Sequence, residues 1–144
     1  MKFVGFTFTK LNAEKSGKPI SKLSINNNVN ILQISQSKEG FLKTKEPLLK
    51  FDFNYGIEYK PDVAKINLEG SVLALVDSKI AKAVLKEWKD KKVHEEIRDL
   101  LFNFILKKAT LKALELEDAL SLPAHLPLPS IRFSKDSGSK SAKK

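Results

Sequence analysis

The chain has 144 residues, enough for one domain with a substantial hydrophobic core and too few for two. Hydrophobic residues make up 42% and charged residues 30%, a balance that excludes a disordered chain. No cysteine is present, so disulfides and thiolate metal sites are excluded as well. The formal net charge is +9 at pH 7, and a charge of this size bears on the choice of partner rather than on the fold.

Nothing in the hydropathy pattern predicts a membrane protein. No apolar run approaches the roughly 18 residues that a membrane-spanning helix needs. Residues 1–8 lack the apolar stretch and small-residue cleavage site of a secretory signal. We therefore expect a soluble cytoplasmic protein with no membrane partner.

Alternating apolar and polar residues predict two β-strands in the first quarter of the chain. The first strand is expected at Val4–Leu11. The stretch Asn12–Ser24 contains a Ser-Gly-Lys-Pro sequence and is interpreted as a loop. Three consecutive asparagines then lead into a second strand at Val29–Gln36, followed by a turn at Ser37–Gly40.

The third strand, Leu48–Tyr59, has the clearest pattern, because every second residue from Leu49 onward is apolar. Such strict alternation predicts one buried and one wet face, as in antiparallel sheets. After a turn at Pro61, a fourth strand is expected at Val63–Val76. Leu73 and Leu75 make its end apolar on both faces, which predicts a cover on the second face.

Beyond residue 77 the apolar spacing becomes helical. A first helix is expected at Ser78–Lys89, with Ser78 as its N-cap. A second helix is expected at Val93–Leu120, with Glu95 and Glu96 in its first turn, where the helix dipole favours carboxylates.

The second helix is apolar around nearly its whole circumference between residues 100 and 106. A helix of this kind is normally buried on all sides, and one four-stranded sheet cannot achieve that for a long helix. We therefore predict self-association, as a homodimer or a larger oligomer. The predicted interface residues are Leu73, Leu75, Leu101, Phe102, Ile105 and Leu106.

The end of the chain is rich first in proline and then in serine and lysine. The prolines at 123, 127 and 129 predict an extended segment over 122–133, in which Ile131 and Phe133 are expected to dock as an anchor. Residues 134–144 are predicted to be a flexible polar tail. The predicted architecture is thus a single α+β domain over 1–133, with a four-stranded antiparallel sheet followed by a short and a long helix.

Residues suited to catalysis or to metal binding are few. His94 and His125 are the only histidines, and they lack the spacing of four that would place two imidazoles on one helical face. There is no Gly-x-Ser-x-Gly sequence and no glycine-rich phosphate loop. We expect a protein that is not an enzyme and that has no metal or cofactor; changing either histidine should then abolish no activity.

Lysines form a regular stripe on the first predicted helix. Lys79, Lys82, Lys86 and Lys89 are spaced by 3, 4 and 3 residues, which places them on one face. Lysine is a compact point charge that suits phosphate groups, each contact adding salt-dependent affinity. A merely solvated helix face remains an equal alternative. Further lysines outside the stripe favour nucleic-acid binding, and the predicted set is Lys79, Lys82, Lys86, Lys89, Lys91, Lys92, Lys140, Lys143 and Lys144.

The order of elements resembles that of the SecB-like fold family: four antiparallel strands, a first helix, a long second helix and an extended segment. The sequence Leu126-Pro127-Leu128-Pro129 is similar to the proline- and leucine-rich region that follows a helix in SecB. The resemblance implies subunits that dimerise through sheets and helices, with apolar grooves for unfolded client chains. Bacterial SecB proteins are acidic whereas this chain is basic, so we expect a shared scaffold and a different partner.

Two functional hypotheses follow from these features. The first is a homo-oligomeric factor that docks on the ribosome or its rRNA and regulates translation, for example by dimerising or hibernating ribosomes. The alternative is a SecB-like holdase chaperone that binds unfolded polypeptides.

Overall fold

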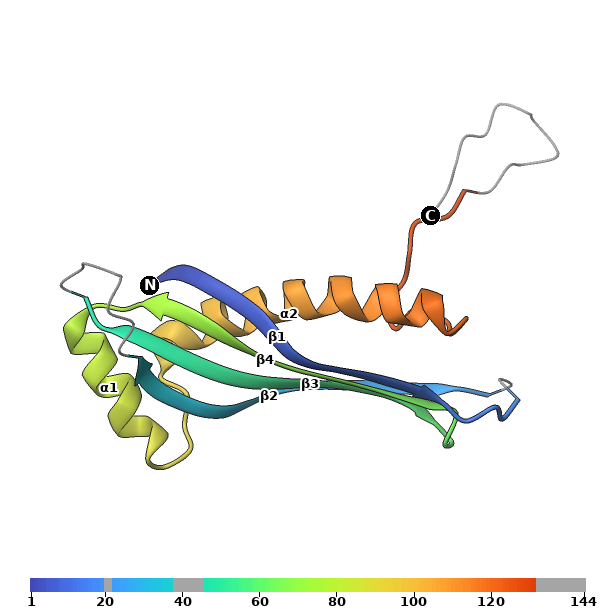
Figure 1. Ribbon diagram of the computed structural model, residues 1–144, viewed down its shortest axis with the longest axis horizontal. Coiled ribbons are helices and arrows are strands. Elements are labelled where there is room, and N and C mark those ends of the chain that lie inside the picture. Colours follow the sequence, from blue (N-terminus) through green and yellow to red (C-terminus); the bar gives the residue numbers. More distant parts are fainter. Residues whose placement is uncertain (20–21, 38–45, 132–144) are drawn as a thin grey trace.

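The computed structural model describes residues 1–19, 22–37 and 46–131, and it confirms the predicted α+β class (Figure 1). Four antiparallel strands are followed by two helices. The elements are β1 (Lys2–Lys15), β2 (Ser24–Ser37), β3 (Leu48–Lys60), β4 (Ala64–Leu75), α1 (Ser78–Trp88) and α2 (Glu95–Ala119).

The four strands form one sheet in the order β1-β4-β3-β2, so β1 and β2 are its edges. Both edge strands are longer than the sequence predicted. Asn12–Lys15 is not a loop, because it pairs with Ala64–Asn67 of β4. The three asparagines lie inside β2, where Asn26 to Asn28 pair with Glu58 to Gly56 of β3. Asparagine has a low strand propensity, and here the backbone ladder overrides it.

Both helices pack on the same face of the sheet. On β3 the predicted alternation is confirmed, because the side chains from Leu49 to Tyr59 on that face are at most 1% exposed. At one end Val76 and Phe51 pack with Val84 of α1. Along the rest of the face α2 covers the two central strands, as Figure 1 shows.

The buried side of α2 is a single row of residues spaced by four. A row of this kind is inclined to the helix axis, so the buried stripe winds around α2 as it crosses a twisted sheet. The row includes two alanines, which let the helix approach the sheet closely, and it ends on a charged residue. Its members are Ile97, Leu101, Ile105, Ala109, Ala113 and Glu117.

The helix ends differ slightly from the prediction. The N-cap of α1 is Asp77 rather than Ser78, because its carboxylate accepts a hydrogen bond from the Lys79 backbone N–H at 3.2 Å. Each helix ends on a residue of positive φ, Lys91 at 60° and Ser121 at 54°. In both cases the next N–H bonds back across the last turn, which is the Schellman arrangement.

The opposite face of the sheet has no covering helix among the residues that the structure describes. Its rows are polar and mixed in charge: Lys10, Glu69, Asn54 and Asn30 lie side by side across the four strands. Leu73 and Leu75 also lie on this face, each partly buried. In the described ranges, neither helix combines the length and apolar character needed to cross a membrane.

Candidate binding surface

The four predicted stripe lysines all lie on the solvent side of α1. Ala81, Val84 and Trp88 form the buried side, with at most 9% exposure. The spacing of 3, 4 and 3 residues places the stripe opposite that side, and every lysine in it is exposed. We define the lysine surface as this stripe with the two lysines that follow α1: Lys79, Lys82, Lys86, Lys89, Lys91 and Lys92.

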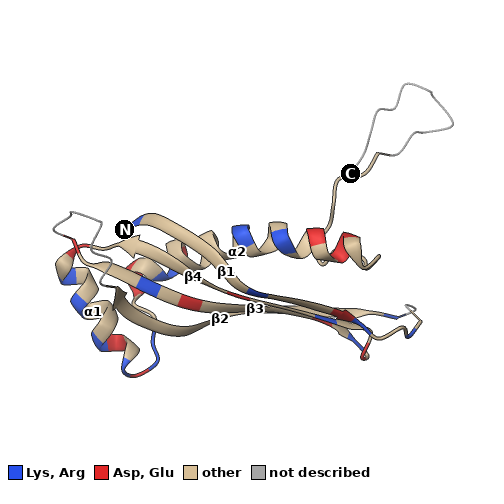
Figure 2. Cartoon of the chain, viewed as in Figure 1, with Lys and Arg blue, Asp and Glu red and all other residues tan. Residues whose placement is uncertain are grey.

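None of the six ammonium groups of the lysine surface forms an ion pair within the described part of the chain, although Glu87 and Asp90 lie in the same segment. The lysines of the uncovered sheet face differ, since Lys10 lies 4.0 Å from Glu69 and Lys50 lies 3.9 Å from Asp52. Figure 2 shows blue residues along α1 and in the turn after it, with red residues among them near the end of the helix.

Lys91 occupies an unusual position at the end of α1. Its φ of 60° lies in the left-handed region, where glycine would be the favoured residue. Its ammonium lies 4.8 Å from the centre of the Trp88 ring, a cation–π contact. The contact holds this charge beside the stripe. Of the predicted nucleic-acid residues, Lys140, Lys143 and Lys144 fall outside the described residues.

The residues predicted for an oligomer interface lie in three different environments. Leu101 and Ile105 are 0% exposed and belong to the core of the subunit itself, so the structure corrects this part of the prediction. Leu73 and Leu75 are partly buried on the uncovered sheet face, and Phe102 is partly buried on a flank of α2. Leu106 is 39% exposed, and Leu100 and Leu111, which were not predicted, are 56% and 63% exposed.

An open cleft of mixed polarity lies between edge strand β2, the end of α1 and the start of α2. One wall is built by a β-bulge, because Ile31 and Gln33 pair with consecutive residues of β3 and leave Leu32 unpaired. Bulges redirect side chains in this way. Leu32 is 48% exposed at the rim. The cleft is lined by Val29, Asn30, Ile31, Leu32, Trp88, Lys91, Val93 and Phe102.

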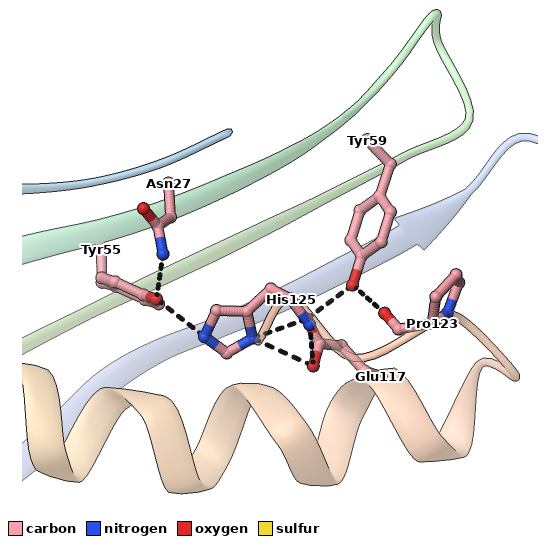
Figure 3. A network of polar contacts seen from close by, with 6 residues as sticks. All are labelled: Asn27, Tyr55, Tyr59, Glu117, Pro123 and His125. Carbon is pink, nitrogen blue, oxygen red and sulfur yellow. Dashed lines mark hydrogen bonds and ion pairs between the residues drawn. The ribbon is translucent and has the colours of Figure 1, made fainter. Parts of the chain in front are cut away.

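A buried polar network holds the chain that follows α2 (Figure 3). Leu122 N–H bonds to the Glu117 carbonyl at 2.8 Å, which turns the chain back toward the sheet. The His125 side chain is then 2% exposed, with Nδ1 2.9 Å from Oε2 of Glu117 and Nε2 3.1 Å from the Tyr55 hydroxyl. Asn27 Nδ2 donates to the same hydroxyl at 3.2 Å.

Tyr59 completes the network from β3. Its hydroxyl lies 2.5 Å from Oε2 of Glu117 and 2.6 Å from the carbonyl oxygen of Pro123, and it donates toward both. Burial, followed by the hydrogen bond to Glu117, raises the pKa of Tyr59 well above its ordinary value. Burial likewise raises the pKa of Tyr55. Both hydroxyls therefore stay protonated, and that of Tyr59 acts as a donor.

The sequence did not indicate this network, since a lone histidine among prolines carries no spacing signal. Histidine beside a carboxylate and a hydroxyl is also a catalytic arrangement. Here all three groups are buried, and they tie the end of the chain to β3 and α2. His94 instead pairs with Glu87 beside the lysine surface. No described group of three or more His, Asp and Glu residues is placed to hold a metal ion.

Comparisons of the chain with protein-family models, with curated proteins and with solved structures found no match in any of the three. Within residues 1–19, 22–37 and 46–131 the sheet is covered on one face only, and the first helix carries the lysine surface without ion pairs. That surface is the strongest feature from which a function can be inferred.

Proposed function

We propose that the chain is a self-associating binding protein without enzymatic activity. It docks on structured RNA, and its preferred partner is a ribosomal subunit or the rRNA of that subunit. The lysine surface is the observation that supports this proposal. Its six exposed ammonium groups form no ion pair with any described residue, and together they create a positive potential that attracts a polyanion. Translation regulation, for example by dimerising or hibernating ribosomes, is the cellular role we propose.

Phosphate contacts explain how such a surface gains affinity. Each ammonium that meets a phosphate releases condensed counterions, so the binding constant falls steeply with salt concentration. Lysines spaced by three and four residues on a helix follow one another at intervals of about 4.5–6 Å along its axis. An extended phosphate backbone can therefore meet several of them at once. No base-specific contact is needed.

The test is the salt dependence of binding to purified ribosomal subunits and rRNA. We expect log K to fall linearly with log salt concentration for the unchanged chain. A variant in which four lysines are changed to Gln should bind more weakly; these are Lys79, Lys82, Lys86 and Lys89. The slope of its log K against log salt concentration should be less steep by about 3–4. Binding that stays constant from low to high salt would exclude the phosphate mechanism.

The matched control changes four lysines of the uncovered sheet face to Gln, so the net charge falls by the same amount. These are Lys10, Lys50, Lys60 and Lys65. Because Lys10 and Lys50 lie beside Glu69 and Asp52, and Lys65 lies across the strands from Glu14 and Glu58, the control should keep most of the affinity and slope. Equal losses in the two variants would show that only total charge matters, and not the lysine surface.

Self-association is supported by three exposed leucines on α2. Leu100, Leu106 and Leu111 are 56%, 39% and 63% exposed, although α2 also buries a complete stripe against the sheet. Exposed apolar patches on a soluble domain commonly mark a protein interface. A symmetric dimer would carry two lysine surfaces and could bridge two RNA-containing particles. Sedimentation equilibrium at low and high protein concentration measures the predicted oligomer.

A SecB-like holdase is the second candidate, and the cleft between β2 and α2 is the observation that favours it. Its lining of Ile31, Leu32, Trp88 and Phe102 suits apolar segments of an unfolded chain. A holdase should suppress the aggregation of a denatured client at stoichiometric ratio, and Phe102→Asp should weaken that effect. Failure of the unchanged chain to suppress aggregation would eliminate this candidate.

A further inference from the structure

The two edge strands of the sheet differ in how well they are protected against pairing with another strand. A free edge presents a row of unpaired backbone groups, and proteins commonly block it with charged residues and bulges. β1 carries four charged residues and two bulges, which leave Val4 and Thr9 unpaired. In β2, Ser24–Ile31 carries no charge, no proline and no bulge. Among the described residues, this stretch of backbone pairs with β3 alone.

The distribution of charge along the sequence singles out the same strand. The two longest stretches without Lys, Arg, Asp or Glu are residues 23–37 and 119–131. The second contains three prolines, which cannot donate to a β-ladder. Its last residue, Ile131, is 64% exposed and is not the docked anchor that the sequence predicted. In a chain of net charge +9, two copies repel each other least where both are neutral, and β2 is that place.

We propose that β2 pairs antiparallel with β2 of a second copy of this chain, about a two-fold axis at Asn28. Opposed residues of an antiparallel pair point to the same face. If both sheets keep their apolar faces on one side, the axis must therefore pass through a residue and not between two residues. The middle of the regular stretch Ser24–Ile31 then leaves Asn27 and Asn28 as candidates.

The surroundings of the two asparagines favour Asn28. Asn27 lies on the covered face, where its amide donates to the Tyr55 hydroxyl at 3.2 Å. Asn28 is exposed on the uncovered face, and its side chain has no hydrogen bond with any described residue. Two facing Asn28 amides can each donate and accept. In this register Ile25 meets Ile31 of the second copy on the covered face, where both residues already pack against the core.

This arrangement also keeps the two lysine surfaces apart. Trp88 at the end of α1 lies on β2, with Nε1 3.4 Å from Oε1 of Gln33. Gln33 lies five residues beyond Asn28, so the two copies of Gln33 are separated by about 30 Å. The Debye length at physiological ionic strength is only about 8 Å, so repulsion between the lysine surfaces is largely screened. The inference rests on the self-association in the proposed function and names β2 as its contact.

Single-cysteine variants test the proposal, because the native chain contains no cysteine. Asn28→Cys protein is oxidised gently without RNA. The control is Thr7→Cys, an exposed position on the same face of the other edge strand. We expect the Asn28→Cys disulfide dimer to form at least about tenfold faster, because the axis brings the two thiols together. Asn26→Cys and Asn30→Cys should each react slowly alone and rapidly when mixed, because residue 26 meets residue 30 across the axis.

A charge at the axis gives a second measurement. Asn28→Lys places two like charges side by side in the dimer, so we expect its dissociation constant to rise at least about tenfold in sedimentation equilibrium. Thr7→Lys adds the same charge to β1 and should leave the dissociation constant nearly unchanged.

Two results would overturn the proposal: an Asn28→Cys rate no greater than that of Thr7→Cys, or equal dissociation constants for the two lysine variants. An oligomer that persists with equal cysteine rates would place the contact elsewhere, so this inference would fail while the proposed self-association stands. A failure of RNA binding would alter neither measurement.

Discussion

His125 Nδ1 lies 2.9 Å from the carboxylate of Glu117, and this contact ties the chain after α2 back onto the helix that it has just left. The carboxylate is on a residue that is 1% exposed, and it depends on His125 and Tyr59 for hydrogen bonds. Removing one buried partner leaves an unsatisfied group, which costs more than the bond itself contributes.

We therefore expect His125→Ala to lower the free energy of unfolding by about 2 kcal/mol. Urea unfolding followed by Trp88 fluorescence measures this value. His94→Ala is the matched control, because His94 pairs with Glu87, whose side chain is 41% exposed, and its loss should cost less than about 1 kcal/mol. Equal costs for the two variants would show that the His125 network adds no stability.

The two tyrosines of the chain are both buried, and this predicts an alkaline limit to stability. The pKa of each is raised in the folded state above the ordinary value near 10. Above about pH 10 the unfolded chain releases phenolic protons that the folded chain retains, so the free energy of unfolding falls as the pH rises. Below about pH 10 both states keep these protons, and the tyrosines do not change the free energy of unfolding. Tyrosinate absorbance at 295 nm should rise together with unfolding. A normal titration near pH 10 of a chain that stays folded would contradict the burial.

Lys91 combines a strained left-handed backbone with a charge that belongs to the lysine surface. Changing it to Gly relieves the left-handed backbone, and changing it to Ala does not, so Lys91→Gly should be more stable than Lys91→Ala by about 1 kcal/mol. Both variants lose the same ammonium group. Each should reduce the slope of log K against log salt by about 1 if Lys91 meets a phosphate. Thermal unfolding and RNA titration measure the two effects, and equal stabilities would argue against strain at this position.

Gly70 in β4 allows β1 and the core to approach each other closely. A Cβ at this position would overlap the carbonyl oxygen of Thr7 and lie 2.9 Å from the Phe53 ring. We expect Gly70→Ala to destabilise the fold by about 2–3 kcal/mol, measured by urea unfolding. Gly5→Ala is the control, because its Cβ would meet the flexible end of Leu73 at 3.2 Å and should cost less than about 1 kcal/mol. A larger loss for Gly5→Ala would reverse this interpretation.

The sequence was most informative where the determining pattern is local. The alternation in β3 identified the strand and its buried face, because the side-chain period of a strand is set by the backbone. The spacing of Lys79, Lys82, Lys86 and Lys89 identified a one-sided stripe for the same reason. The order of four strands and two helices followed from these periods.

Strand pairing and the packing of α2 on the sheet determined the features that local patterns did not predict. Asn12–Lys15 and the asparagines of β2 became strand because partners in β4 and β3 satisfied their backbones. Because α2 is apolar around nearly its whole circumference between residues 100 and 106, the sequence could not reveal which residues would meet the sheet. Leu101 and Ile105 were therefore assigned to the wrong environment.

Only part of the candidate site could be predicted from the sequence. Local spacing gave the lysine stripe by itself. The absence of ion pairs on the lysine surface, the cleft beside the Leu32 bulge and the contact of Tyr59 with Glu117, 58 residues later, could be seen only in the described part of the folded chain. Contacts between distant residues depend on where strands and helices dock, and no period in a linear sequence encodes that.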